Sequence, residues 1–205
     1  MTNLFFDLDG TLTHSHQGII RCINHALADA GAGARSDAEL RPFLGPPLRE
    51  AFATLLQTTD DARVEQAMRA YRSRFEAIGM FENAVCPGIP AALDALAQAG
   101  YGLHVVTVKP TVYARRILEH FRLDGFFRSI RGSDLDGRGY TKGSLIRDAL
   151  RATAADARFT AMIGDRGEDM AGAVQWGLRY RCSVGVRGCA RILRCRRRPC
   201  RRFAG

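Results

Sequence analysis

Two carboxylates follow the first apolar segment of this 205-residue chain. They are Asp7 and Asp9, in the run Phe5-Phe6-Asp7-Leu8-Asp9-Gly10-Thr11-Leu12-Thr13. Residues two apart on a strand point to the same side. If residues 4–6 form a buried parallel strand, both carboxylates emerge at its carboxyl end, where open α/β sheets bind ligands. An ordinary D-x-D-G turn remains an alternative. An EF-hand does not, because Gly18 stands where the twelfth loop position needs Glu.

Two later apolar segments also end in polar residues. Residues 103–108 read Leu-His-Val-Val-Thr-Val and contain Thr107, and residues 159–163 lead into Gly164-Asp165-Arg166-Gly167-Glu168-Asp169. Between them, Lys142 opens a helical pattern over residues 142–151. Each of these residues alone has an ordinary structural explanation. Thr107 could be a β-branched residue at a strand end, Lys142 a solvated helix lysine, and Asp165 a turn former. Four short motifs in this order indicate one site more strongly than any of them alone.

The ordered set resembles the haloacid dehalogenase superfamily of phosphohydrolases, and within it the phosphoglycolate phosphatase-like branch, over residues 3–178. The resemblance implies an α/β fold, a Rossmann-like parallel sheet core with a small helical cap inserted after the first strand. Alternating strand and helix patterns after residue 88 agree with a parallel sheet and right-handed crossovers. We therefore expect a core at residues 1–13 and 85–178, a cap at 14–84, and an anomalous tail at 179–205.

The resemblance also implies roles for the polar residues. Asp7 would be the nucleophile that forms an aspartyl-phosphate, and Asp9 the acid that protonates the leaving oxygen and then activates water. Mg²⁺ would be the cofactor, held by Asp7, the backbone carbonyl of Asp9 and Asp165, with Asp169 in support. Few carboxylates with retained waters suit this ion.

Phosphate and substrate contacts complete the expected site. Thr107 and Lys142 would hold the phosphoryl oxygens and neutralise their charge. In the cap, Arg49 is the candidate to reach an anionic substrate, although a solvated helix arginine explains it equally well.

The implied activity is Mg²⁺-dependent hydrolysis of small phosphate monoesters, with 2-phosphoglycolate as the leading substrate. A carboxylate at position 9 favours phosphate ester hydrolysis or phosphomutase chemistry over dehalogenation. The alternatives are a nucleoside 5′-monophosphatase, a more distant sugar phosphomutase, and a weakened pseudo-enzyme whose arginine-rich tail binds nucleic acid. We expect a small phosphorylated metabolite as partner, no membrane, a monomer or homodimer, and a cytoplasmic location, since neither a signal peptide nor a long apolar run is evident.

The net charge of +9 comes from the end of the chain. Residues 179–205 contain ten arginines and no acid, whereas residues 1–178 hold 20 basic and 21 acidic residues. Such a tail could bind nucleic acid through phosphates. It also carries four of the six cysteines, but they lack the paired C-x₂-C spacing of a zinc site. A nucleic-acid partner is therefore expected only if the tail is genuine and exposed.

A reading-frame shift is our preferred explanation of the tail. With suitable codons, residues 179–188 shifted by one base read Val-Ile-Gly-Val-Leu-Trp-Gly-Tyr-Gly, which is similar to the core strand of related phosphatases. If the tail is instead genuine, we expect residues 182–186 to replace part of that edge strand.

We predict that resequencing the gene will find one inserted or deleted base near codon 179 that restores this ending. If no single insertion or deletion restores it, the frameshift hypothesis is wrong.

Overall fold

The computed structural model describes residues 2–45, 47–135 and 139–182. Within them the chain forms two compact units. One contains residues up to Thr13 and from Val85 onward, and the other is His14–Ala84.

The first unit is built on a five-stranded parallel sheet with the order β3-β2-β1-β4-β5. The strands are β1 (Asn3–Phe6), β2 (Gly102–Pro110), β3 (Ser129–Ser133), β4 (Thr160–Gly164) and β5 (Arg179–Cys182). The sheet order reverses at β1, between β2 and β4, and ligands bind at such switch points in open α/β sheets. This α/β fold class is the one expected from the sequence.

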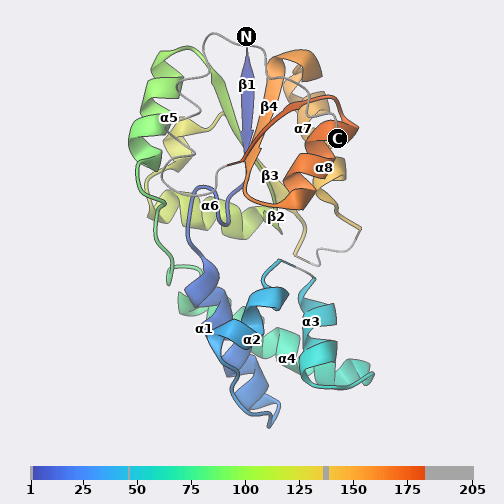
Figure 1. Ribbon diagram of the computed structural model, residues 1–205. Coiled ribbons are helices and arrows are strands. Elements are labelled where there is room, and N and C mark those ends of the chain that lie inside the picture. The colour runs from blue at the N-terminus through green and yellow to red at the C-terminus, as the bar shows by residue number, and fades with distance from the viewer. Residues whose placement is uncertain (1, 46, 136–138, 183–205) are drawn as a thin grey trace. The chain divides into compact units, whose positions relative to one another are not determined.

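Helices cover both faces of this sheet (Figure 1). On one side lie α5 (Ile89–Gln98) and α6 (Thr111–His120), and on the other α7 (Lys142–Thr153) and α8 (Gly167–Gln175). The short turns η3 (Asp124–Phe126) and η4 (Ala157–Phe159) precede β3 and β4. Each crossover returns the chain to a parallel strand, so every strand of the sheet ends at the same edge.

The central strand that leads to this edge is buried on both faces. In β1, Leu4 to Phe6 are all buried, as expected for a central parallel strand covered on both faces. Under α7 and α8, Phe5, Val106 and Met162 from three strands pack with Ile146 and Ala173. This core holds α7 and α8 against the sheet, and with them Lys142 and Asp169.

The second unit is helical. It contains α1 (His16–Asp29), α2 (Asp37–Leu40), η1 (Arg41–Phe43), α3 (Leu48–Leu55), α4 (Asp61–Arg74) and the π-helical turn η2 (Phe75–Gly79). Helix α4 packs against both α1 and α3, and the Tyr71 and Phe75 rings stack with centroids 5.6 Å apart. The apolar stripes of these helices therefore form the core of this unit.

Strand β5 occupies residues that the sequence interpretation assigns to the anomalous tail. Its register pairs Ala161 with Arg179 and Gly164 with Cys182, so the edge strand begins directly after buried Leu178 rather than at residue 182. The Tyr180 hydroxyl donates a hydrogen bond to the Gly164 carbonyl, 3.1 Å away, which ties β5 to the end of β4. The rest of the expected tail, residues 183–205, lies outside the described residues.

No helix within the described ranges is both long and apolar enough to span a bilayer.

Truncation of Ile146 to Ala should destabilise the sheet unit. Its side chain is fully buried between α7 and the sheet, so the change removes apolar contacts and leaves a cavity costing about 2 to 5 kcal/mol. Urea unfolding followed by circular dichroism measures this loss. The matched control is Val174→Ala on α8, where the side chain is 69% exposed and the change should stay below about 0.5 kcal/mol. Equal losses in both variants would contradict the packing described.

Candidate active site

The loop after β1 directs two carboxylates to the ligand-binding edge of the sheet. Asp7 is buried, and its N–H donates to the Ile163 carbonyl at 2.9 Å, so pairing with β4 extends one residue beyond β1. Gly10 then turns the chain with a φ of 82°. A side chain at this position would overlap the Asp165 carboxylate, so glycine is required both for the backbone angle and for the space.

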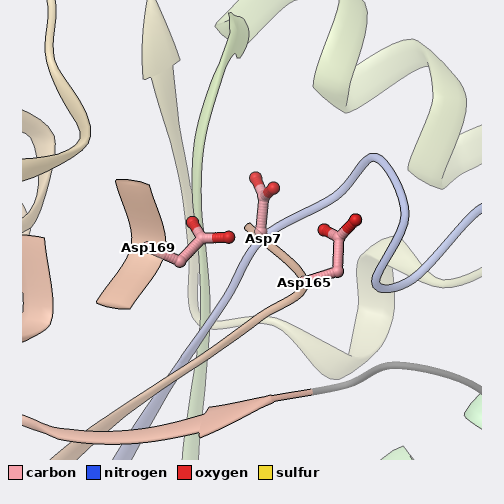
Figure 2. A group of neighbouring side chains, drawn as sticks. All are labelled: Asp7, Asp165 and Asp169. Atoms are coloured by element: carbon pink, nitrogen blue, oxygen red, sulfur yellow. The ribbon is translucent and has the colours of Figure 1, made fainter. Parts of the chain in front are cut away.

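Asp7, Asp165 and Asp169 form an acidic cluster (Figure 2). One carboxylate oxygen from each lies within 4.8 Å of the others. The three residues come from the end of β1, the turn after β4 and the first turn of α8. Segments more than 150 residues apart in the sequence are thus brought together by adjacent parallel strands.

One hydrogen bond orients each of the two later carboxylates. The Thr11 hydroxyl donates to Asp165 Oδ1 at 3.3 Å, and the Arg166 N–H donates to Asp169 Oδ2 at 3.1 Å. The second bond caps the start of α8, where a carboxylate is also favoured by the helix dipole. A side chain at Gly164 would overlap Asp169, so that glycine makes room for the cluster.

Lys142 is the cation that balances this cluster. Its Nζ lies 2.8 Å from both Asp7 Oδ1 and Asp169 Oδ1, and it donates to the Val106 carbonyl at 3.1 Å. The side chain is only 3% exposed, and the capping box of Thr141 and Ser144 fixes the helix start that carries it. The solvated-lysine explanation of this residue is therefore wrong.

The pKa shifts follow this arrangement of charges. Burial lowers the pKa of Lys142, but Asp7 and Asp169 outweigh that effect and hold the pKa above its ordinary value. Burial raises the pKa of Asp165, and the charge of Asp7 raises it further. Burial and Asp7 likewise raise the pKa of Asp169 despite its pairing with Lys142. Ionisation of these carboxylates is thus unfavourable in the metal-free site, and an additional cation would favour their charged forms.

The residues present fit a magnesium ion. All three groups of the cluster are carboxylates, the hard oxygen donors that Mg²⁺ prefers, and there are few enough of them to leave room for retained waters. The glycine at position 10 keeps the space beside Asp165 free of a side chain.

Lys109 is a second buried cation at this edge of the sheet, and the sequence interpretation did not single it out. Lys109 Nζ lies 3.0 Å from Asp9 Oδ2, and the Lys109 N–H donates to Thr107 Oγ1 at 3.2 Å. Thr107 and Lys109 are both buried. The available signal was the i, i+2 spacing of Thr107 and Lys109, the same spacing as that of Asp7 and Asp9 directly after the neighbouring strand.

Arg49 lies in the helical unit, where it is already paired. Its guanidinium is 3.1 Å from Asp61 Oδ1 and also contacts the Glu65 carboxylate. These pairs join α3 to α4, which gives Arg49 a structural explanation, and its contact with substrate stays a prediction.

One family model, described as haloacid dehalogenase-like hydrolase, matches residues 4–182. Apart from Asn3, that range contains all residues of the five strands and every residue of the acidic cluster. The chain belongs to this family.

Curated relatives of the chain carry several names. A 5′-nucleotidase of Pseudomonas aeruginosa is 44% identical over 86% of this chain and 79% of its own. The tyrosine-protein kinase PtkA of Mycobacterium tuberculosis is 36% identical over 85% of this chain, but only 59% of its own length is covered. A phosphoglycolate phosphatase of Cereibacter sphaeroides is 33% identical over 88% of this chain and 84% of its own.

The solved structures agree on the fold. The crystal structure of "a predicted phosphatase from Clostridium acetobutylicum" has a TM-score of 0.80 at 37% identity, covering 93% of this chain and 90% of that one. The family and these relatives confirm the expected membership, the α/β fold and the assignment as a phosphoric monoester hydrolase.

Replacing Lys142 by Met should strongly destabilise the sheet unit in the presence of EDTA. The variant leaves Asp7 and Asp169 buried together without their common cation, and breaking a buried ion pair costs about 3 to 5 kcal/mol. Chemical denaturation measures the loss. The control is Arg158→Met, whose ion pair with Asp156 is exposed, so its removal should leave the unfolding midpoint unchanged. An unchanged midpoint for Lys142→Met would show that this lysine does not stabilise the cluster.

Proposed function

We propose that this protein hydrolyses small phosphate monoesters with Mg²⁺ as cofactor, through a phosphoryl group carried covalently on Asp7. The observation that carries the proposal is the position of Asp7, which belongs to the acidic cluster and is also 2.8 Å from Lys142. A carboxylate can attack a phosphate dianion only where cations offset the repulsion between them.

Each side chain then has a defined task. Asp7 attacks phosphorus and the ester oxygen departs, which leaves the phosphoryl group on the Asp7 carboxylate. Asp9 protonates the departing oxygen and afterwards removes a proton from the water that attacks the phosphorus. Lys142 and the Thr107 hydroxyl bind the phosphoryl oxygens as charge develops on them.

The acidic cluster supports the metal part of the proposal. Asp7, Asp165 and the backbone carbonyl of Asp9 would hold Mg²⁺, with Asp169 in support. When bound, the ion supplies positive charge that neutralises the phosphoryl oxygens and the nucleophile. The two proton transfers do not involve the ion, because Asp9 carries out both of them.

Two substrates deserve separate tests. The resemblance to the phosphoglycolate phosphatase-like branch favours 2-phosphoglycolate, and a phosphoglycolate phosphatase is among the relatives. A 5′-nucleotidase is 44% identical to the chain and the phosphoglycolate phosphatase 33%, which supports screening nucleoside 5′-monophosphates first. We propose the helical unit His14–Ala84 as the cap that selects between them. A cytoplasmic location and a monomeric or homodimeric state stay predictions.

The decisive test measures phosphate release from p-nitrophenyl phosphate, nucleoside 5′-monophosphates and 2-phosphoglycolate, with Mg²⁺ and with EDTA. We expect turnover only with Mg²⁺, and a loss of at least about 10³-fold in Asp7→Asn, which keeps the size of the side chain but removes the nucleophile. Glu168→Gln is the matched control, because it neutralises an exposed acid next to the cluster.

Activity that survives in Asp7→Asn would overturn the covalent route. No turnover by folded wild-type protein would instead favour the weakened pseudo-enzyme. In that case, salt-dependent DNA binding that disappears on deleting residues 179–205 would support the nucleic-acid alternative.

A further inference from the structure

Lysine is almost absent from this chain. Of its 30 basic residues, 28 are arginine and only Lys109 and Lys142 are lysine. Both are buried, and each pairs with one carboxylate of the Asp7-Leu8-Asp9 motif. Lysine is a compact point charge on a flexible stem, whereas arginine is a broad planar fork. The chain thus uses the compact cation at the two buried places where a carboxylate of this motif is paired in a confined space.

The geometry of β2 explains how Lys109 reaches Asp9. Thr107 is 1% exposed, Val108 is 43% exposed and Lys109 is 8% exposed, so the two polar residues share the buried side of the strand. Regular pairing of β2 with β3 is interrupted between Val106 and Pro110. Such an irregularity re-aims side chains at the end of a strand, and here it turns Lys109 toward the loop after β1.

Contacts from β3 fix this irregular segment. The Ser133 hydroxyl donates to the Val108 carbonyl at 2.9 Å, and the Gly132 N–H donates to Thr111 Oγ1 at 2.9 Å. A side chain at Gly132 would overlap the Lys109 carbonyl oxygen, so the backbones approach closely there. Contacts with β3 therefore hold the backbone both before and after Lys109.

The two oxygens of Asp9 have different surroundings. Oδ2 is 3.0 Å from Lys109 Nζ, whereas Oδ1 is buried and has no hydrogen-bond partner within the described parts of the chain. A carboxylate fixed through one oxygen presents the other in a defined direction. This is the arrangement that a group exchanging a proton with a substrate oxygen requires.

We propose that Lys109 is the positioning residue of Asp9, holding Oδ2 so that Oδ1 faces the ester oxygen that leaves. The inference rests on the proposed function, since it assigns Lys109 a part in the same reaction. Lys109 also contributes through its backbone. Its N–H occupies a lone pair of Thr107 Oγ1, which leaves the hydroxyl proton to be donated to a phosphoryl oxygen.

Two other roles for Lys109 make different predictions. A lysine that binds the phosphoryl group directly would affect all substrates equally, because every substrate carries that group. A purely structural ion pair would change stability and disturb the reaction without regard to the leaving group. A residue that acts through Asp9 matters most for leaving groups that need a proton.

The experiment compares kcat/KM for p-nitrophenyl phosphate and for an alkyl phosphate, a nucleoside 5′-monophosphate or 2-phosphoglycolate. It uses wild type, Lys109→Met, Asp9→Asn and the double variant. The nitrophenolate leaves without protonation, whereas an alkoxide needs it. We expect Lys109→Met to lower kcat/KM by about 10²-fold for the alkyl ester and by less than about 10-fold for p-nitrophenyl phosphate.

The double variant provides the readout that a structural role would not change. In the Asp9→Asn background, Lys109→Met should change kcat/KM by less than about twofold, because Lys109 would no longer have a carboxylate to position. Lys109→Arg should recover part of the lost alkyl ester activity. Val108→Ala, an exposed change in the same irregular segment, is the matched control and should behave as wild type.

Lys109→Gln is tested in parallel, because its amide can partner Asp9 if Lys109→Met fails to fold. Equal losses for both substrates, or full additivity with Asp9→Asn, would overturn the positioning role. The proposed function fails separately, if wild type is inactive or Asp7→Asn stays active.

Discussion

Repulsion between buried carboxylates is the constraint around which the sheet unit is arranged. Asp7, Asp165 and Asp169 converge to within 4.8 Å, where unneutralised charges would repel strongly in a medium of low dielectric constant. Lys142 offsets part of that repulsion from the start of α7. Burial, together with the charge of Asp7, raises the pKa of both Asp165 and Asp169. A site under such strain gains free energy when a cation binds, so the same repulsion that weakens the metal-free fold favours metal binding.

Neighbouring parallel strands bring the charged residues of the site together. Asp7 and Asp9 directly follow β1, and Thr107 and Lys109 lie near the end of neighbouring β2 with the same two-residue spacing. The chain thus sets an anionic pair beside a hydroxyl and a cation without any long loop. Close approaches at glycine positions, such as Gly10 beside Asp165, provide the necessary space. The site residues therefore lie together because neighbouring parallel strands end at the same edge of the sheet.

Much of this arrangement was predictable, because it follows from local rules. The alternation of strand residues and the order of strands and helices suffice to place Asp7, Asp165 and Lys142 at one edge of a parallel sheet. For Lys109 the sequence shows only its two-residue spacing from Thr107, because the interrupted pairing between β2 and β3 at this point is a tertiary feature. For Arg49 the sequence reveals the charge but not its partners. Sequence shows that a cation is present, but only the structure shows that Asp61 and Glu65 neutralise it.

The scarcity of lysine also has a practical consequence for labelling. Reagents that acylate amines attack the uncharged, solvent-exposed form, and both lysine side chains of this chain are at most 7% exposed and ion-paired. Apart from the α-amino group, every site of amine acylation therefore lies inside the sheet unit next to Asp7 or Asp9. The rate of acylation would report how often this edge of the sheet opens, and a cation or anion that closes the site would slow it. The molecule thus carries a built-in chemical probe of its own local opening.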